Sequence, residues 1–223
     1  MTSIGDGAFW ACGHLKEVII PDSVTSIGGW AFYKCRNLKE VIIPDGVASI
    51  GDYAFAECSS LTEIVVDENN ANYSSLDGNL YNKEQTELIQ YAIGKIDAFF
   101  IIPNSVSSIG GYAFATCSSL TGVVIPDSVT SIGGYAFNYC SSLTGVVIPD
   151  SVTSICEYAF AYCSSLTEVV IGDSVTSIGE SVFEDCDDLT NITFEGTVEQ
   201  WKDIEKGYFW SHWISEVVCS MAQ

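Results

Sequence analysis

The chain has 223 residues, 48% of them hydrophobic, and a formal net charge of −21 at pH 7. Lysine and arginine are absent between Lys95 and Lys202, a stretch that carries 13 acidic residues. This charge excludes an electrostatic grip on nucleic acid or on anionic lipid. No apolar run approaches the roughly 18 residues that a membrane-spanning helix needs, so we expect no membrane insertion in this segment.

A unit of 23 residues is repeated along the chain. Residues 120–142 (LTGVVIPDSVTSIGGYAFNYCSS) recur almost unchanged as 143–165, and more loosely as 15–37, 38–60 and 166–188. A fixed period of this length predicts a solenoid, in which each coil buries its apolar face against the next coil.

Each unit predicts the same short elements in the same order. The opening L-x-x-V-x-I alternates with period two, which predicts a strand with one buried face, and stacked coils place these strands in a parallel sheet. Proline, first at Pro21, ends the strand because it has no N–H for the sheet. Gly28 and its equivalents supply a permissive backbone for a bend. The segment x-x-A-F-x-x-C spaces its apolar residues by three to four, which predicts a helical or 3₁₀ turn.

Two residue types recur at fixed core positions. We expect the phenylalanines to form one internal aromatic column: Phe9, Phe32, Phe55, Phe114, Phe137, Phe160 and Phe183. Seven of the nine cysteines share another position: Cys12, Cys35, Cys58, Cys117, Cys140, Cys163 and Cys186. Because they recur one per coil and not in pairs, we expect buried free thiols and no metal site.

In chain order the repeats predict a single solenoid over residues 1–223. Residues 1–14 form a partial repeat, 15–60 two repeats, 61–119 a long repeat, 120–188 three repeats, and 189–223 a C-terminal cap. The long repeat holds an insert at about 67–98, where Asp77-Gly78 predicts the turn of a β-hairpin. This insert is interpreted either as an alternative coil or as a functional loop. In the cap, a short helix over 198–206 and a strand over 214–219 are predicted, next to Trp201, Trp210 and Trp213.

The pattern L-x-x-V-x-I-P-x-S-V-T-S-I-G-x-x-A-F-x-x-C resembles the leucine-rich repeat, and more narrowly its BspA-like (Treponema pallidum-type) subtype. The resemblance covers nearly the whole chain and implies a leucine-rich repeat solenoid with a parallel sheet on its concave face. It also implies an extracellular or cell-surface location, because family members are typically secreted or displayed by bacteria and several are regarded as adhesins. The sequence opens within a repeat and without a signal peptide, so we expect a piece of a longer protein.

The outward residues of the predicted sheet are the candidate binding residues. In L-x-x-V-x-I the third and fifth positions point away from the core. Gly122 and Gly145 interrupt the acidic third positions and would let a partner approach an aliphatic row at the fifth positions. The candidates on this concave face are Glu17, Ile19, Glu40, Ile42, Glu63, Val65, Ile101, Val124, Val147, Glu168 and Val170.

The sequence offers no set of side chains for catalysis and no phosphate-binding loop, so we expect neither an enzyme nor a cofactor. Its two histidines, His14 and His212, lie at opposite ends of the repeat array. An aspartate column could hold Ca²⁺, although Asp-Ser is ordinary turn chemistry: Asp22, Asp45, Asp127, Asp150 and Asp173. We therefore expect a protein-interaction scaffold with adhesin-like binding, whose partner could be a host or matrix protein or a second copy. The alternatives are a passive stalk or spacer, and a carbohydrate-binding unit that uses the aromatic cap.

Overall fold

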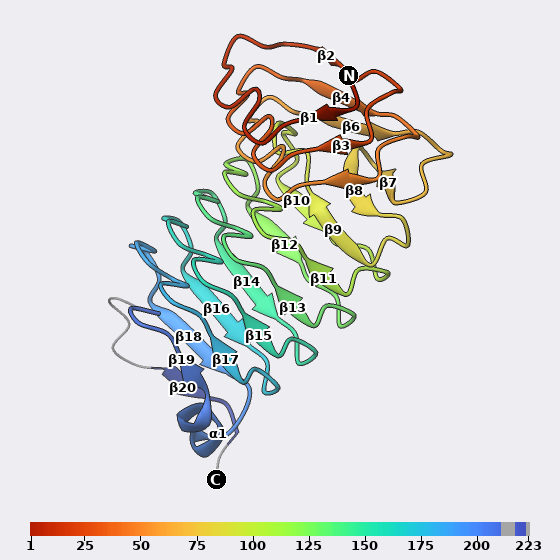
Figure 1. Cartoon of the computed structure of the whole chain (residues 1–223). Coiled ribbons are helices and arrows are strands. Elements are labelled where there is room, and N and C mark those ends of the chain that lie inside the picture. The colour runs from red at the N-terminus through yellow and green to blue at the C-terminus, as the bar shows by residue number, and fades with distance from the viewer. Residues whose placement is uncertain (211–216, 222–223) are drawn as a thin grey trace. The chain divides into compact units, whose positions relative to one another are not determined.

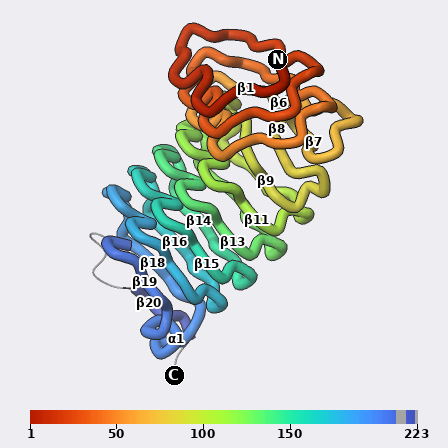
Figure 2. The backbone as a smooth tube through the Cα atoms, viewed as in Figure 1, coloured from red at the N-terminus to blue at the C-terminus, as the bar shows by residue number. Residues whose placement is uncertain are grey.

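The structure is a computed structural model that describes residues 1–210 and 217–221. Its contacts divide the chain into two compact units. Unit 1 consists of Met1–Lys95 and Gly110–Ala115, and unit 2 of Ile96–Ile109 and Thr116–Gln223. Figures 1 and 2 show that each unit is built from stacked coils.

In unit 1 the coils stack through two parallel ladders of strands. The longer strands are β2 (Val18–Ile19), β4 (Glu40–Ile43) and β6 (Glu63–Val66), and the shorter ones are β1 (Ser3–Ile4), β3 (Ser26–Ile27) and β5 (Ser49–Ile50). Paired residues are one repeat apart, as with Val18 and Val41 or Ser26 and Ser49. Like residues therefore stack on like residues, as the repeat predicted.

Unit 2 continues the same pattern with more strands. Its longer strands are β10 (Phe99–Ile101), β12 (Gly122–Val124), β14 (Gly145–Ile148), β16 (Glu168–Ile171), β18 (Asn191–Phe194) and β20 (Val217–Cys219). Its shorter strands are β11 (Ser108–Ile109), β13 (Ser131–Ile132), β15 (Ser154–Ile155), β17 (Ser177–Ile178) and β19 (Glu205–Lys206). All these pairs are parallel, which confirms the predicted parallel sheet.

The x-x-A-F-x-x-C segment folds as a chain of single turns. In one coil Ala31, Tyr33 and Cys35 donate their N–H groups to the carbonyl three residues earlier. The alternate N–H groups, of Phe32 and Lys34 for example, donate to the carbonyls of the next coil, Ala54 at 2.8 Å and Ala56 at 3.0 Å. The predicted helical character is therefore limited to single turns, and a third line of inter-coil hydrogen bonds runs through this segment.

Left-handed backbone recurs in these turns at residues other than glycine. Trp30, Tyr53, Tyr135 and Tyr158 have φ between 52° and 61°. Such a conformation costs roughly 1–2 kcal/mol for a residue with a Cβ, and it aims the N–H at the next coil, as with Tyr158 N–H on Glu180 O at 2.9 Å.

The bend glycines serve a different purpose from the predicted one. Gly28 and Gly51 do not adopt positive φ; a Cβ on Gly51 would lie 2.3 Å from the backbone nitrogen of Gly29 in the preceding coil. Glycine is needed at Gly51 because two backbones approach closely there, and the expectation of a permissive bend was wrong for these residues.

The aromatic column is present within each unit, with one addition. In unit 1 the Phe32 ring stacks between Phe9 and Phe55, with centroid distances of 5.1 and 5.5 Å. Tyr91 stacks on Phe114 at 5.1 Å and stands at the phenylalanine position of its own coil, one repeat before Phe114. The expected column therefore contains a tyrosine that the prediction omitted. In unit 2 a ring stack joins Phe137, Phe160 and Phe183.

The cysteine column is hydrogen-bonded as well as packed. All nine cysteines are free thiols, and six of the seven in the repeat position are buried. The thiols of Cys58 and Cys163 donate to the carbonyls of Phe32 and Phe137 in the preceding coil at 3.1 and 3.2 Å. Cys12, in the first coil, is exposed, so the expectation of burial was wrong for that thiol.

The insert forms three antiparallel strands and an irregular coil of unit 1. They are β7 (Tyr73–Leu76), β8 (Asn79–Asn82) and β9 (Glu87–Gln90). The β7–β8 turn contains Asp77 and Gly78, both with positive φ. Gly78 O accepts the N–H of Ile64 at 2.9 Å, which ties the hairpin to β6.

The cap closes the end of unit 2 with a helix and two strands. Helix α1 (Val198–Asp203) begins with a capping box formed by Thr197 and Gln200. The Trp201 ring packs against Phe194 and Trp210 at 5.2 and 5.5 Å. β20 pairs with β18, which confirms the predicted last strand over its described part. Within the predicted cap, His212, Trp213 and Ile214 lie outside the described residues.

Candidate binding face

The longer strands present alternate side chains to the two sides of their sheet. In β4 and β14 the second and fourth residues are buried and the first and third are more accessible. This follows from the period-two geometry of a strand. The first and third residues of β4, Glu40 and Ile42, are the third and fifth positions of the repeat, where the candidate residues were predicted.

The aliphatic row at the fifth position is accessible in both units. In unit 1 the Ile19 side chain is 92% exposed and Ile42 is 54% exposed, while Val65 is half-buried. In unit 2 Ile101, Val124 and Val147 are 63%, 41% and 57% exposed, and Val170 is half-buried. Each unit therefore carries a strip of β-branched side chains that its own core does not cover.

Carboxylates border this row at the third position. Glu17, Glu40, Glu63 and Glu168 are exposed. Glu40 and Glu63 pair in register between β4 and β6 of unit 1, and Gly145 of unit 2 pairs with Glu168. Thus the acidic side chains form a row in unit 1, whereas glycine interrupts the same row in unit 2.

The interruption leaves a groove in unit 2 with a volume of about 570 Å³. It lies across β10, β12, β14 and β16, and its lining includes two glycines and five valines. The groove is lined by Phe99, Thr121, Gly122, Val123, Val124, Thr144, Gly145, Val146, Val147, Glu168 and Val170. Four predicted candidates thus line one concavity: Val124, Val147, Glu168 and Val170.

Phe99 is a groove residue that the sequence reasoning missed. It occupies the third position of its coil, where Glu17 and Glu40 stand in theirs, and it pairs in register with Gly122. A Cβ on Gly122 would lie 2.8 Å from two carbons of the Phe99 ring, so the absent side chain lets this ring fold across β12. The Phe99 side chain is 55% exposed and forms an apolar end of the groove. Counting one repeat back from Gly122 would have identified it.

A second concavity of unit 2, of about 590 Å³, lies between the shorter strands and the cap. Cys156, Glu157, Lys206 and Tyr208 contribute to its lining. Burial raises the pKa of the Cys156 thiol, and Glu157 raises it further. Burial lowers the pKa of Lys206, whose Nζ donates to the carbonyls of Trp201 and Ile204 at 2.5 and 3.1 Å. This ammonium group therefore stabilises the cap.

Neither a group of metal-ligating side chains nor a helix long and apolar enough to cross a membrane occurs among the residues that the structure describes. Within residues 1–210 and 217–221, no three His, Cys, Asp or Glu side chains are grouped so that they could hold a metal ion. In the aspartate column, Asp150 Oδ1 instead accepts the N–H of Asp173 at 3.1 Å. No helix in this part of the chain combines the length and the hydropathy needed to cross a bilayer.

Comparison with solved structures found bacterial leucine-rich repeat proteins that are similar to this chain. The chain is 33% identical to a leucine-rich cell surface protein of Faecalibacterium prausnitzii, with a TM-score of 0.74, and the match covers 92% of this chain and 60% of that protein. The chain thus spans about three-fifths of the length of that relative.

Two more distant structures show the same fold. A leucine-rich repeat protein of Eubacterium ventriosum is 24% identical, with a TM-score of 0.68, and the match covers 93% of this chain and 70% of that one. The pneumococcal vaccine antigen PcpA is 20% identical, with a TM-score of 0.68, and the match covers 100% of this chain and 72% of that one. A comparison with curated proteins gave no match.

The model of the BspA-type leucine-rich repeat region matches residues 1–94 and 91–212 in six copies. These two ranges contain the repeats, the insert and most of the cap, and the stacked strands have the one-repeat register that the family pattern implies. The chain therefore belongs to the BspA-type leucine-rich repeat family.

Proposed function

We propose that this chain is a non-enzymatic scaffold that binds a protein partner through the groove of unit 2. The groove is the observation that carries the proposal, because exposed β-branched side chains and a half-exposed phenylalanine line it. Exposing an apolar row brings a domain no stability, whereas covering it removes apolar surface from water, a gain of about 25 cal/mol per Å² before the entropy cost of association.

The surroundings of the groove favour a partner with positive charge. Glu168 lies at its edge, and the sequence from residue 96 to residue 201 contains no lysine or arginine. Charge complementarity of this kind raises the rate of association and suppresses partners of like charge. A second copy of this chain, with its net charge of −21, is a poor partner on the same ground.

We further propose that the scaffold is a module of a secreted or surface-displayed bacterial protein with an adhesive role. Support comes from the Faecalibacterium relative, which is described as a cell surface protein and is 33% identical to this chain over the matched region. A host or matrix protein is the partner class that this location favours.

A panel of purified extracellular matrix proteins, immobilised for interferometry, tests both proposals. The triple variant Val124→Thr, Val147→Thr and Val170→Thr keeps β-branched shape while it removes apolar surface, so its melting temperature should stay within about 3 °C of the wild type. Its binding should fall at least about tenfold, because the partner loses three apolar contacts. The matched control is Ile19→Thr, Ile42→Thr and Val65→Thr, which makes the same change on unit 1 and should retain binding.

Gly145→Thr supplies an independent test of the groove. A Cβ at Gly145 has its nearest neighbour, the carbonyl oxygen of Glu168, at 3.7 Å, so the strand accepts a side chain there. The new side chain fills the groove and should weaken binding while the fold is kept. Undiminished binding by the folded Val-to-Thr triple variant would place the site elsewhere. Failure of the wild type to bind any protein of the panel would favour a passive stalk.

A further inference from the structure

Tyrosine side chains stack in pairs on the turn segments of unit 2. The Tyr139 and Tyr162 rings lie 4.4 Å apart between centroids and 2° from parallel. The Tyr135 and Tyr158 rings, four residues earlier in the same two coils, lie 4.8 Å apart and 10° from parallel. The Tyr139 side chain is 50% exposed, so its aromatic surface is open to solvent.

Two carboxylates follow this stack in the next coil. Asp185 stands one repeat after Tyr162, beside Glu184, whose backbone carbonyl accepts the N–H of Tyr162 at 2.7 Å. The charge of Glu184 is the main cause that raises the pKa of Tyr162, followed by burial, Tyr139 and Asp185. Tyr139, Tyr162, Glu184 and Asp185 therefore share one surface, which we name the tyrosine–carboxylate patch.

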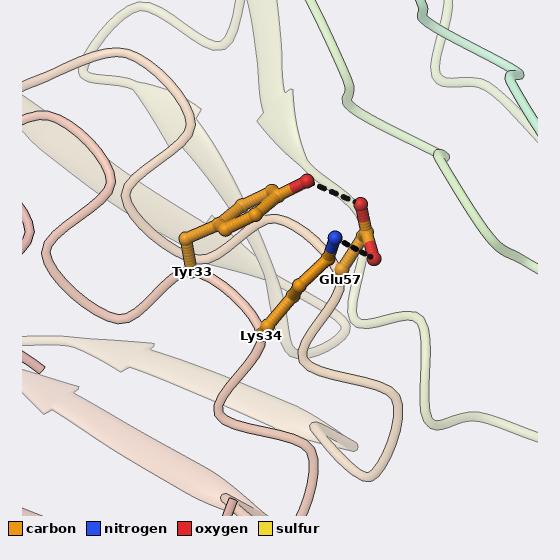
Figure 3. A network of polar contacts seen from close by, with 3 residues as sticks. All are labelled: Tyr33, Lys34 and Glu57. Carbon is orange, nitrogen blue, oxygen red and sulfur yellow. Dashed lines mark hydrogen bonds and ion pairs between the residues drawn. The ribbon is translucent and has the colours of Figure 1, made fainter. Parts of the chain in front are cut away.

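Unit 1 contains a tyrosine and a carboxylate that together hold an ammonium group. Lys34 Nζ lies 4.9 Å from the centroid of the Tyr33 ring and 3.5 Å from Glu57 Oε2 (Figure 3). The Tyr33 hydroxyl donates to Glu57 Oε1 at 2.5 Å (Figure 3). An ammonium group is thus held by one aromatic ring and one carboxylate from the next coil.

The two places share the repeat positions of the lysine and of the carboxylate, whereas the ring comes from different positions. Lys34 and Tyr162 both stand two residues after the core phenylalanine, and Glu57 and Asp185 both follow one repeat later. In unit 2 the Tyr162 ring occupies the position of the lysine, and Ala161 occupies the position of Tyr33. The carboxylates remain, and in the part of the chain that the structure describes neither Glu184 nor Asp185 forms an ion pair.

We propose that the tyrosine–carboxylate patch binds a lysine or arginine side chain of a partner protein. Aromatic faces attract cations electrostatically, and adjacent carboxylates add to that attraction. The sequence from residue 96 to residue 201 contains no lysine or arginine, and no lysine or arginine of the described residues pairs with Glu184 or Asp185, so a partner would supply the cation. The patch shares no residue with the groove, and the proposal stands whether or not the groove binds the same partner.

The test measures binding of a tetralysine peptide by isothermal titration or NMR, with the Nζ-acetylated peptide as the ligand control. The variant Glu184→Gln with Asp185→Asn keeps side-chain shape and removes both charges. The variant Tyr139→Asn with Tyr162→Asn removes both rings, and asparagine tolerates the positive φ of 57° and 62° at these positions. Each double variant should weaken binding of tetralysine about fivefold or more.

The matched control is Asp97→Asn with Asp127→Asn, which removes two exposed charges of unit 2 away from the patch sequence. It should change affinity less than about twofold, because salt screens distant surface charges. An equal loss in this control would show attraction to net charge alone and overturn the proposal. Equal binding of the acetylated peptide, or full binding by the tyrosine variant, would also overturn it. The groove variant with three valines replaced should bind tetralysine as the wild type does.

Discussion

The coils between residues 120 and 188 and the insert between residues 67 and 95 satisfy their buried groups by different means. The regular coils use backbone ladders and repeated apolar side chains, such as Phe137 stacked on Phe160 at 5.0 Å. The insert instead buries amide side chains: Asn70, Asn79 and Gln90 are at most 4% exposed. The Asn70 amide donates to the carbonyls of Pro44 and Val47 and accepts the N–H groups of Asn72 and Tyr73.

This difference shows what a change of coil geometry requires. A regular coil offers its backbone N–H groups a carbonyl either one repeat away or three residues earlier, as Phe137 N–H on Ala159 O and Asn138 N–H on Tyr135 O show. Antiparallel strands break that match, and every buried backbone group left over must find a partner. Asparagine and glutamine supply both donors and acceptors, and therefore replace the ladder at the insert.

The largest loss of stability should follow a substitution in the aromatic column of the regular coils. Phe160 is fully buried between Phe137 and Phe183, so Phe160→Ala leaves a cavity and removes two ring contacts. We expect a loss of about 3–5 kcal/mol in the free energy of unfolding, measured by urea denaturation. Val147→Ala, at a side chain that is 57% exposed, is the control and should change stability by less than about 0.5 kcal/mol. A similar small loss for Phe160→Ala would mean that the ring stack contributes little to the fold.

The stability of the insert should depend strongly on the amide side chain of Asn70. Asn70→Ala removes four hydrogen bonds and leaves two carbonyls and two N–H groups without their partner. We expect the free energy of unfolding to fall by about 2–4 kcal/mol, because buried groups lose their hydrogen-bond partner. The loss stays below the sum of four separate bonds, because water reaches some of these groups once the side chain is gone. Asn69→Ala is the control, since the exposed Asn69 bonds only to the neighbouring Asp67. Hydrogen exchange should show the loss at residues 67–90; protection equal to that of the wild type would contradict the role given to Asn70.

These two sites also show how far the sequence determines the structure. The buried positions of the strands, such as Val146 and Ile148 in β14, follow from period-two alternation, and Tyr91 could have been assigned by counting one repeat back from Phe114. The bonds of Asn70 could not be predicted, because its partners lie 23 and 26 residues earlier and depend on how the coils stack.

The turn segments and the groove also have features that the sequence alone does not predict. The left-handed backbone at residues such as Trp30 contradicts local preference, which assigns positive φ to glycine and asparagine. Only the inter-coil hydrogen bonds explain the positive φ, and the sequence of a single repeat does not reveal these bonds. The candidate valines of the groove followed from alternation, whereas the depth of the groove arises from the Phe99 ring lying across Gly122.

Alkaline pH should weaken the repeats outside the insert through their buried thiols, such as Cys58 of unit 1, because the insert contains no cysteine. Burial is the main cause that raises the pKa of Cys58 from 9.0 to about 12. A raised pKa on an acid means that the folded state keeps a proton that the unfolded state loses, so stability is complete below pH 9 and falls between pH 9 and 12. Cys58→Ala removes this dependence, and we expect the wild type to lose about 1 kcal/mol relative to the variant between pH 8.5 and 10. Urea midpoints under reducing conditions measure it, and exposed Cys12→Ala serves as control; parallel pH curves for wild type and Cys58→Ala would contradict the prediction.

The smallest expected effect is a gain in stability at Thr116, in the turn segment before the first regular coil of unit 2. This β-branched residue has φ of 65°, and its buried hydroxyl has no hydrogen-bond partner among the described residues. In this conformation the Thr116 N–H donates to Asn138 O at 2.7 Å. Any residue except proline can make this bond. Thr116→Gly relieves the left-handed strain and removes the hydroxyl, against the greater entropy of glycine in the unfolded chain, so we expect a net gain of about 1 kcal/mol.

Thr116→Val separates the two contributions, because it keeps the β-branched shape and removes only the hydroxyl. If the unpartnered hydroxyl dominates, Thr116→Val should recover most of the gain; if backbone strain dominates, only Thr116→Gly should. Destabilisation by both variants would show that the threonine side chain makes a packing contribution larger than either cost. In that case the left-handed turn residues would be stabilised by their side chains, and the inter-coil N–H bond alone would not account for their conformation.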